Sequence, residues 1–231
     1  MNSGLLTIDD FPSANAPALV DYFSGMGIQV IFFATGENLE AHYEHGLYAL
    51  RKGMLVGNHS WSHPGFSSLT LEEGIAEIER CERILDRLYR DAGVPRRYRP
   101  FRFPYGDKGG ENRAALQQYL REHGFNRVAD DHIRYPWWHH NGLEEEIDTF
   151  WTFDFREYAL CQEPGLTRDY VWQRMHDPAP AQGAALFGPD NRHILLMHDH
   201  AETEAVLPGY YRLFTEHLLE NGFVFDAPSF V

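Results

Sequence analysis

The chain has 231 residues, of which 43% are hydrophobic and 14% aromatic. This composition is typical of a globular protein rather than a disordered one, and the length suits one α/β barrel. The 34 acidic side chains outnumber the 20 basic ones and give a formal net charge of −14, which argues against a surface that binds nucleic acid or an anionic membrane.

Cysteine spacing and apolar content narrow the class of protein further. Cys81 and Cys161 belong to no CxxC pair, so a zinc site built from cysteines is excluded. No apolar stretch approaches the roughly 20 residues that span a bilayer, and residues 1–4 run into a strand without a secretory signal. We expect no membrane span, in a chain that is either cytoplasmic or exported after loss of its signal. The sequence leaves the oligomeric state open.

Short apolar runs alternate with helical segments along the chain. Runs that are apolar, and in part β-branched or aromatic, predict strands; they lie at residues 5–8, 29–34, 54–57, 99–103, 125–129, 149–153, 193–197 and 223–225. Apolar residues spaced three and four apart predict helices; these lie at residues 16–26, 39–51, 70–91, 111–123, 170–176 and 210–220. Loops are expected at residues 135–142 and 177–190.

Helix ends and the order of elements predict the fold class. Thr70 and Glu73 form a T-x-x-E capping box at the start of the longest expected helix, and Asn38 is the expected N-cap of the helix at 39–51. The alternation favours parallel strands with helices outside them. No linker or internal repeat interrupts it, so we predict one domain over residues 1–231.

Polar side chains follow five of the predicted strands. They are Asp9 and Asp10, His59 and His63, Arg102 and Tyr105, Asp154 and Glu157, and His198 and Asp199. The carboxyl ends of the strands of a parallel barrel face one side, where active sites form. This shared placement predicts one site at that face.

Asp9 and Asp10 are adjacent carboxylates at the end of the first strand. Side chains alternate along a strand, so the two are expected to point in different directions, and one can ligate a metal while the other acts as a base. Turn chemistry is the alternative, since Asp is common in turns and Phe11-Pro12 follows.

His59 and His63 stand at positions i and i+4, and they face one ion if the segment takes a helical turn. With Asp10 they supply two nitrogens and one oxygen, which leaves positions open for water and substrate, as in catalytic sites. A pair of surface or capping histidines is the alternative, in a chain with 13 histidines.

Two further motifs supply groups for catalysis. Arg102 is placed to pair with Asp9 and hold it ionised. The Pro-Tyr-Gly turn at Tyr105 is placed to present a backbone N–H to an oxyanion. His198, at the tip of an apolar strand, suits a general acid. The alternative for the Pro-Tyr-Gly segment is an ordinary surface turn, and the alternative for His198 is a buried, hydrogen-bonded histidine without a catalytic role.

Four motifs occur in an order that resembles the polysaccharide deacetylases of carbohydrate esterase family 4, the NodB-homology family. They are Thr-Ile-Asp-Asp (7–10), His-Ser-x-x-His (59–63), Arg-x-Pro-Tyr (102–105) and Leu-x-His (196–198). The resemblance extends over most of the chain. It implies a distorted (β/α) barrel of about seven to eight parallel strands.

The resemblance also implies a role for each site residue. The ligands of a divalent ion are Asp10, His59 and His63. The catalytic residues are Asp9 as the base, Arg102 to orient it, the Tyr105 N–H for the oxyanion and His198 as the acid. Zinc is the expected ion, with cobalt and nickel as alternatives, because all three accept two imidazoles and a carboxylate.

Two motifs depart from the family pattern. The fourth commonly reads W-x-x-D-x-x-D-W, and here Glu157 and Tyr158 replace its second Asp and last Trp. The carboxylate that tunes His198 is therefore either Asp154 or Glu157. The first motif commonly has Gly where this chain has Phe11, and because Phe does not readily adopt a positive φ, we expect the turn beside the site to differ in shape.

The expected reaction is removal of acetyl groups from N-acetylated sugars of a poly- or oligosaccharide, so the expected partner is a carbohydrate of chitin or peptidoglycan type. Aromatic side chains suited to stacking on sugar rings are Trp61, Tyr105, Trp137, Trp138 and Tyr158. One alternative is a same-fold hydrolase of a small cyclic amide, like the allantoinase-like relatives; the complete metal set disfavours it. The other is a non-catalytic carbohydrate-binding protein, which has no need of Asp9 or His198.

Overall fold

The computed structural model describes residues 2–188 and 191–231. Met1 lies outside these residues, as do the last two residues of the loop expected at 177–190. The described strands form one sheet in the order β3-β2-β1-β5-β4, with β6 beside the start of β1, and every pairing is parallel. Their bounds are β1 (Ser3–Phe11), β2 (Val30–Ala34), β3 (Leu55–Asn58), β4 (Phe153–Asp154), β5 (Arg192–His198) and β6 (Val224–Phe225).

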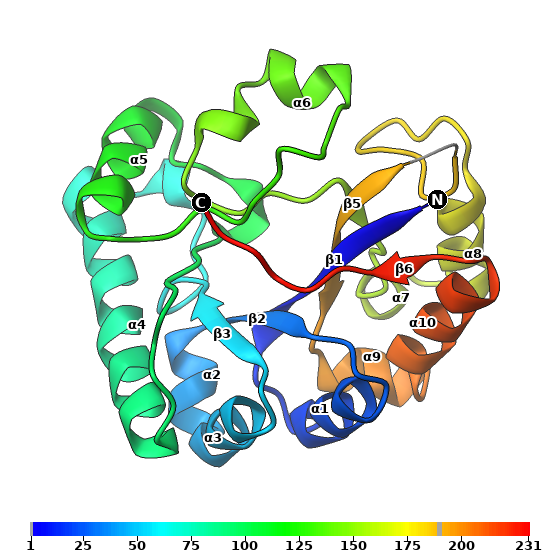
Figure 1. Cartoon of the computed structure of the whole chain (residues 1–231), viewed down its shortest axis with the longest axis horizontal. Coiled ribbons are helices and arrows are strands. Elements are labelled where there is room, and N and C mark those ends of the chain that lie inside the picture. The colour runs from blue at the N-terminus through cyan, green and yellow to red at the C-terminus, as the bar shows by residue number, and fades with distance from the viewer. Residues whose placement is uncertain (1, 189–190) are drawn as a thin grey trace.

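Helices lie around the outside of this sheet (Figure 1). Their bounds are α1 (Ala16–Gly25), α2 (Gly36–Ala41), α3 (Tyr43–Arg51), α4 (Leu71–Ala92), α5 (Arg113–Glu122), α6 (Pro136–His140), α7 (Ala159–Gln162), α8 (Arg168–His176), α9 (Ala201–Val206) and α10 (Tyr210–Glu220). Short 3-10 turns lie at η1 (Phe66–Ser68), η2 (Pro104–Gly106), η3 (Gly110–Asn112) and η4 (Leu143–Glu145). In the described part of the chain, none of the helices combines the length and the apolar character that crossing a membrane requires.

Both faces of the central strands are buried, as in parallel sheets that helices cover. Successive residues of β2 face opposite sides. Phe32 packs in the larger apolar cluster with Leu6, whereas Ile31 and Phe33 pack in a second cluster with Leu5. Burial on both faces explains why β2 is an uninterrupted apolar run, and it gives the strand ends that carry the site a rigid support.

The α/β class, the parallel sheet and the distorted barrel are confirmed. Among the residues that the structure describes, the sheet is not closed and has six strands, against the about seven to eight that were expected. The strand expected at 99–103 contributes only one parallel bridge, between Phe101 and Asn58. Pro100 and Pro104 bracket this segment and lack the N–H that a ladder needs. The other shortened strands are those expected at residues 125–129, which form one antiparallel bridge, and at 149–153, of which only Phe153 belongs to β4.

The expected helix ends are partly confirmed. At α4, Oγ1 of Thr70 accepts from the Glu73 N–H (3.2 Å) and the Glu73 carboxylate accepts from the Thr70 N–H (2.8 Å), so the capping box is confirmed. The single helix expected at 39–51 is instead α2 followed by α3. Its N-cap is Thr35 rather than Asn38, which lies inside α2, because the Thr35 side chain is the one that accepts a free N–H of the first turn.

Candidate active site

Most of the predicted site residues converge on one cavity of about 620 Å³ at the carboxyl ends of the strands. Those that line it are Asp9, Asp10, His59, His63, Tyr105, Asp154, Tyr158 and His198. Arg102 and Glu157 lie behind its wall and are almost fully buried. The carboxyl-end face of the sheet therefore gathers the groups that the sequence scatters over almost its whole length.

Asp9 and Asp10 lie at a break in the regular geometry of β1. The register with β2 shifts between Ile8 and Phe11, and Asp10 has a φ of 61°, while Phe11 remains in the strand. The break interrupts the alternation of side chains, so the expectation that the two carboxylates diverge is wrong. Oδ2 of Asp9 and Oδ1 of Asp10 lie 3.4 and 3.7 Å from the same atom, Nε2 of His59.

The segment after β3 brings two imidazoles to the same point. His59 and His63 are not on a helical turn, contrary to the expectation from their spacing; the chain bends through left-handed residues at Ser60 (φ 67°) and His63 (φ 59°). Asn58 Oδ1 accepts from the Ser60 N–H (2.8 Å), and Ser60 Oγ accepts from the His63 N–H (3.2 Å). These side-chain contacts stabilise a bend that the backbone alone disfavours.

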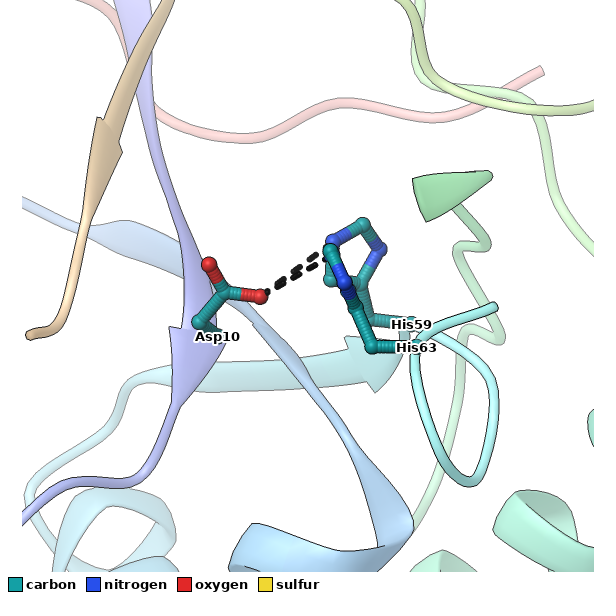
Figure 2. A group of neighbouring side chains, drawn as sticks. All are labelled: Asp10, His59 and His63. Atoms are coloured by element: carbon teal, nitrogen blue, oxygen red, sulfur yellow. Dashed lines mark ion pairs between the residues drawn. The ribbon is translucent and has the colours of Figure 1, made fainter. Parts of the chain in front are cut away.

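Asp10, His59 and His63 form a compact set of potential ligand atoms (Figure 2). Oδ1 of Asp10 lies 3.7 Å from His59 Nε2 and 3.2 Å from His63 Nε2, and one ligand atom of each residue lies within 4.8 Å of the others. Nδ1–H of His59 donates to the carbonyl of Arg102 (2.8 Å). This bond leaves Nε2 with its lone pair toward the set, as in metal-ligating histidines.

The electrostatics of this set also suit a cation. Burial lowers the pKa of His63 to about 4, so its imidazole is neutral at pH 7, which is the form that binds metals. Burial opposes ionisation of Asp10, but the hydrogen bond from His200 and the neighbouring imidazoles outweigh it and lower the Asp10 pKa. Two imidazole nitrogens and a carboxylate oxygen therefore fit a divalent ion of the zinc type.

Arg102 holds Asp9 from behind the cavity. Its Nη1 donates to Oδ1 of Asp9 (2.7 Å) and to Oγ1 of Thr7 (2.8 Å), and its Nε donates to the carbonyl of Thr149 (2.9 Å). The guanidinium also lies over the ring of Phe33, 4.4 Å from its centroid. Because both charges are buried, the pair offsets their desolvation, and Oδ2 of Asp9 is left beside the ligand set.

The opposite wall carries an imidazole paired with a carboxylate. Nδ1–H of His198, at the end of β5, donates to Oε1 of Glu157 (3.2 Å), which also accepts the backbone N–H of His198. Asp154 lies within 4.8 Å of both groups, but the hydrogen bond is made by Glu157. Burial disfavours the imidazolium, yet the charge and hydrogen bond of Glu157 outweigh burial and raise the pKa of His198 to about 10. The imidazole is therefore protonated at neutral pH.

Asp154 and Tyr105 complete the walls of the cavity. Burial raises the pKa of Asp154 to about 6, and its Oδ1 accepts the N–H of Arg156 (2.8 Å). Tyr105 has a φ of 59° and is 73% exposed. Its ring lies edge-on to that of His63, with centroids 4.5 Å apart, so Tyr105 flanks the ligand set on the solvent side.

The amino-terminal half of the chain matches a known family. Residues 2–128, more than half of the chain, match the family model described as polysaccharide deacetylase. The chain belongs to the polysaccharide deacetylase family. The matched residues include the ligand set, Asp9, Arg102 and Tyr105, whereas His198 lies beyond them.

Curated members of the polysaccharide deacetylase family are similar over about half of this chain. It is 35% identical over 115 residues to chitin deacetylase 1 of Cryptococcus neoformans var. grubii, a match that covers 49% of this chain and 23% of that protein. It is 34% identical over 104 residues to the peptidoglycan-N-acetylglucosamine deacetylase of Bacillus cereus, covering 44% and 36%. The matches thus span about a quarter to a third of the length of these relatives.

Solved structures from the polysaccharide deacetylase family share the fold over nearly the whole chain. The polysaccharide deacetylase Bc1974 from Bacillus cereus has a TM-score of 0.66 at 20% identity, covering 98% of this chain and 92% of that one. A family 4 carbohydrate esterase from Streptomyces lividans, in complex with acetate, has 0.62 at 21%, covering 96% and 90%. A mutant of a CE4 family pseudoenzyme has 0.59 at 19% and covers 97% of this chain. Because a protein described as a pseudoenzyme shares the fold, activity must be argued from the site.

Of the five aromatic residues expected to stack on substrate, Tyr105 and Tyr158 line the cavity and the three tryptophans do not. Trp61 is 6% exposed and lies in the larger apolar cluster. Trp138 is 1% exposed and donates from Nε1 to Asp130 (3.0 Å), and Trp137 packs against the same second cluster. Trp137 and Trp138 lie on α6, a helix in a stretch expected to be a loop, and face apolar neighbours there. Stacking of the three tryptophans on a sugar stays a prediction.

The residues that line the cavity but were not predicted for the site include Trp151 and His200. Trp151 lines the wall, and Nε2 of His200 lies 2.7 Å from Oδ2 of Asp10. Trp151 is the first residue of the fourth motif. His200 stands two residues after His198, a spacing that in an extended segment places both on one side, and this was the signal that could have found it.

Proposed function

We propose that the chain removes acetyl groups from N-acetylated sugars of a poly- or oligosaccharide by metal-dependent hydrolysis. One observation carries the proposal: a carboxylate outside the ligand set, Asp9, and a protonated imidazole, His198, share one cavity with a three-residue ligand set. Hydrolysis of an acetamide needs these parts, because water must be activated and the departing amine protonated.

The proposed metal ligands are Asp10, His59 and His63. Their donor set suits zinc, and cobalt or nickel as alternatives. When bound, a divalent ion supplies Lewis-acid polarisation of the acetyl carbonyl and activation of water at neutral pH. Three protein ligands are typical of catalytic zinc sites, which keep a position open for substrate.

Asp9 is the proposed general base. Its Oδ1 accepts from Arg102, so Oδ2 is the oxygen that takes a proton from the attacking water. The water oxygen bonds to the acetyl carbon, and the carbonyl oxygen becomes an oxyanion. The backbone N–H of Tyr105 donates to this oxyanion.

His198 is the proposed general acid. Because Nδ1–H is held by Glu157, the proton available for transfer is on Nε2. It passes to the amide nitrogen as the C–N bond breaks, which gives acetate and a free amino sugar. Glu157 tunes the imidazole as its hydrogen-bonded partner, and Asp154 acts on it through charge alone.

The charges of the cavity are nearly balanced in the proposed metal-loaded state. Its described lining contains four carboxylates, those of Asp9, Asp10, Glu37 and Asp154, and no Lys or Arg. A divalent ion on the ligand set would offset two of these charges, and the imidazolium of His198 and the guanidinium of Arg102 offset two more. The charge of the cavity therefore does not select between N-acetylglucosamine and N-acetylmuramic acid, and the proposed sugar is of chitin or peptidoglycan type.

Acetate release from chitooligosaccharides, measured with and without a chelator, tests this function. Release should stop on chelation and return with added Zn²⁺. A hydrolase of small cyclic amides would instead open such a ring, and a non-catalytic binding protein would retain the oligosaccharide unchanged. No acetate from any glycan by the metal-loaded protein would overturn the proposal.

A further inference from the structure

The two oxygens of the Asp10 carboxylate have different partners. Oδ1 lies beside the Nε2 atoms of His59 and His63, at 3.7 and 3.2 Å. Oδ2 lies 2.7 Å from Nε2 of His200, on a part of the chain 190 residues away. The carboxylate is therefore shared between a ligand set and an imidazole that is not part of that set.

His200 fits a hydrogen-bond donor better than a fourth ligand. The compact set of ligand atoms contains Asp10, His59 and His63 without it. Two donor atoms on one tetrahedral zinc lie about 3.3 Å apart, given bonds of about 2.0–2.1 Å. The 2.7 Å contact between His200 and Asp10 is shorter and matches a charge-assisted hydrogen bond.

The backbones on both sides of this contact are fixed independently. The carbonyl of Asp10 accepts from Nδ2 of Asn38 (2.7 Å), so rotation of the carboxylate is the main freedom left to Asp10. On the other side, the N–H of Asp199 donates to the carbonyl of Asp9 (2.9 Å), and the Asp199 carboxylate accepts from the N–H and Oγ of Ser13 (2.7 and 2.6 Å). His200, the next residue, is thus presented to Asp10 from an anchored chain.

We propose that His200 is a positioning residue: its Nε2–H holds Oδ2 of Asp10, so that Oδ1 alone is presented to the divalent ion. This inference rests on the proposed metal site. Partners of this kind orient metal ligands, and their loss typically costs about 10- to 100-fold in metal affinity. His200 adds such a partner to the carboxylate, as the Arg102 carbonyl does for His59.

Zinc affinity of His200→Leu and His200→Gln tests the inference. The dissociation constant is measured by competition with a chromophoric chelator, and the visible spectrum of the Co²⁺-loaded protein reports the ligand set. His200→Leu removes the donor and should weaken zinc binding by about 10- to 100-fold. His200→Gln places an amide N–H near the position of Nε2 and should recover most of the affinity with an unchanged Co²⁺ spectrum.

His139→Leu is the matched control, because it removes another histidine–carboxylate pair, with Glu144 at 3.0 Å, outside the cavity. It should bind zinc like the wild type. Wild-type affinity in His200→Leu would overturn the inference and leave the proposed function standing. Equal losses in His200→Leu and His200→Gln, with a changed Co²⁺ spectrum, would overturn it in favour of direct ligation. A wild-type chain that binds no zinc, or binds it equally after Asp10→Ala, would instead contradict the proposed metal site.

Discussion

His63 and His198 line one cavity, and their surroundings push their pKa values in opposite directions. At His63 burial dominates and lowers the pKa to about 4. At His198 burial acts in the same direction, but Glu157 outweighs it and raises the pKa to about 10. One wall thus presents a neutral nitrogen suited to a metal, and the other a protonated imidazole. Environments that separate the pKa values of neighbouring groups assign their roles in catalysis.

The two walls also differ in how they are built. The wall that carries Asp10, His59 and His63, here called the ligand wall, follows β1 and β3 and lies inside the region that matches the family model. The wall that carries His198 and Glu157, here called the acid wall, follows β5 and the two-residue β4. It has Glu157 and Tyr158 in place of the common Asp and Trp of the fourth motif. The family model thus covers the ligand wall, where Phe11 departs from the common motif, and does not reach the acid wall, where Glu157 and Tyr158 depart from it.

Asp9→Asn should have the largest effect on kcat. The variant tests whether the proposed base on the ligand wall acts separately from metal binding. An amide still accepts from Arg102 but cannot take a proton, so kcat should fall by about 100- to 10,000-fold while zinc affinity is kept. Acetate release and chelator competition measure the two quantities. Asp131→Asn, at an 88% exposed side chain, should change neither. A wild-type kcat in Asp9→Asn would remove Asp9 from the mechanism.

Glu157→Gln should reduce the difference in pKa between His63 and His198. In the proposed mechanism His198 acts as an acid, so activity should fall as the pH rises through its pKa. Loss of the Glu157 charge lowers that pKa, by about one to three pH units for a charge this close, and the alkaline fall in kcat/KM should begin at lower pH. Asp154→Asn removes the carboxylate that makes no hydrogen bond to the imidazole, so its shift should be smaller. An alkaline limb that does not move in Glu157→Gln would refute this pairing.

Tyr158→Trp should have the smallest effect on kcat. The variant restores the common Trp of the fourth motif and measures how much its replacement by Tyr changes the acid wall. The rings of Tyr158 and His198 meet edge-on, with centroids 4.7 Å apart, and Trp retains an aromatic edge while the bond to Glu157 stays. We expect kcat within about 10-fold of wild type, which is about 1.4 kcal/mol in activation free energy, and a change mainly in KM. A collapse of kcat would show that the acid needs the phenol hydroxyl.

Local signals in the sequence determined much of the fold and the composition of the site. The capping box at Thr70 and Glu73 and the apolar run at 29–34 correspond to α4 and β2, because capping and burial on both faces act over a few residues. Site residues were found because parallel strands bring their carboxyl ends to one side. Pro100 and Pro104 were a local signal of weak pairing at residues 99–103, because proline lacks the N–H of a strand ladder, but that this segment forms a single bridge to β3 was seen only in the structure.

Only the tertiary structure decided which atoms meet. In the structure His200 contacts Asp10, 190 residues away in the sequence, Glu157 is the hydrogen-bond partner of His198, and Trp138 is buried. Periodicity determines the face of an element on which a side chain lies. The distance between two side chains depends instead on register, on bulges such as the one at Asp10, and on how distant segments pack.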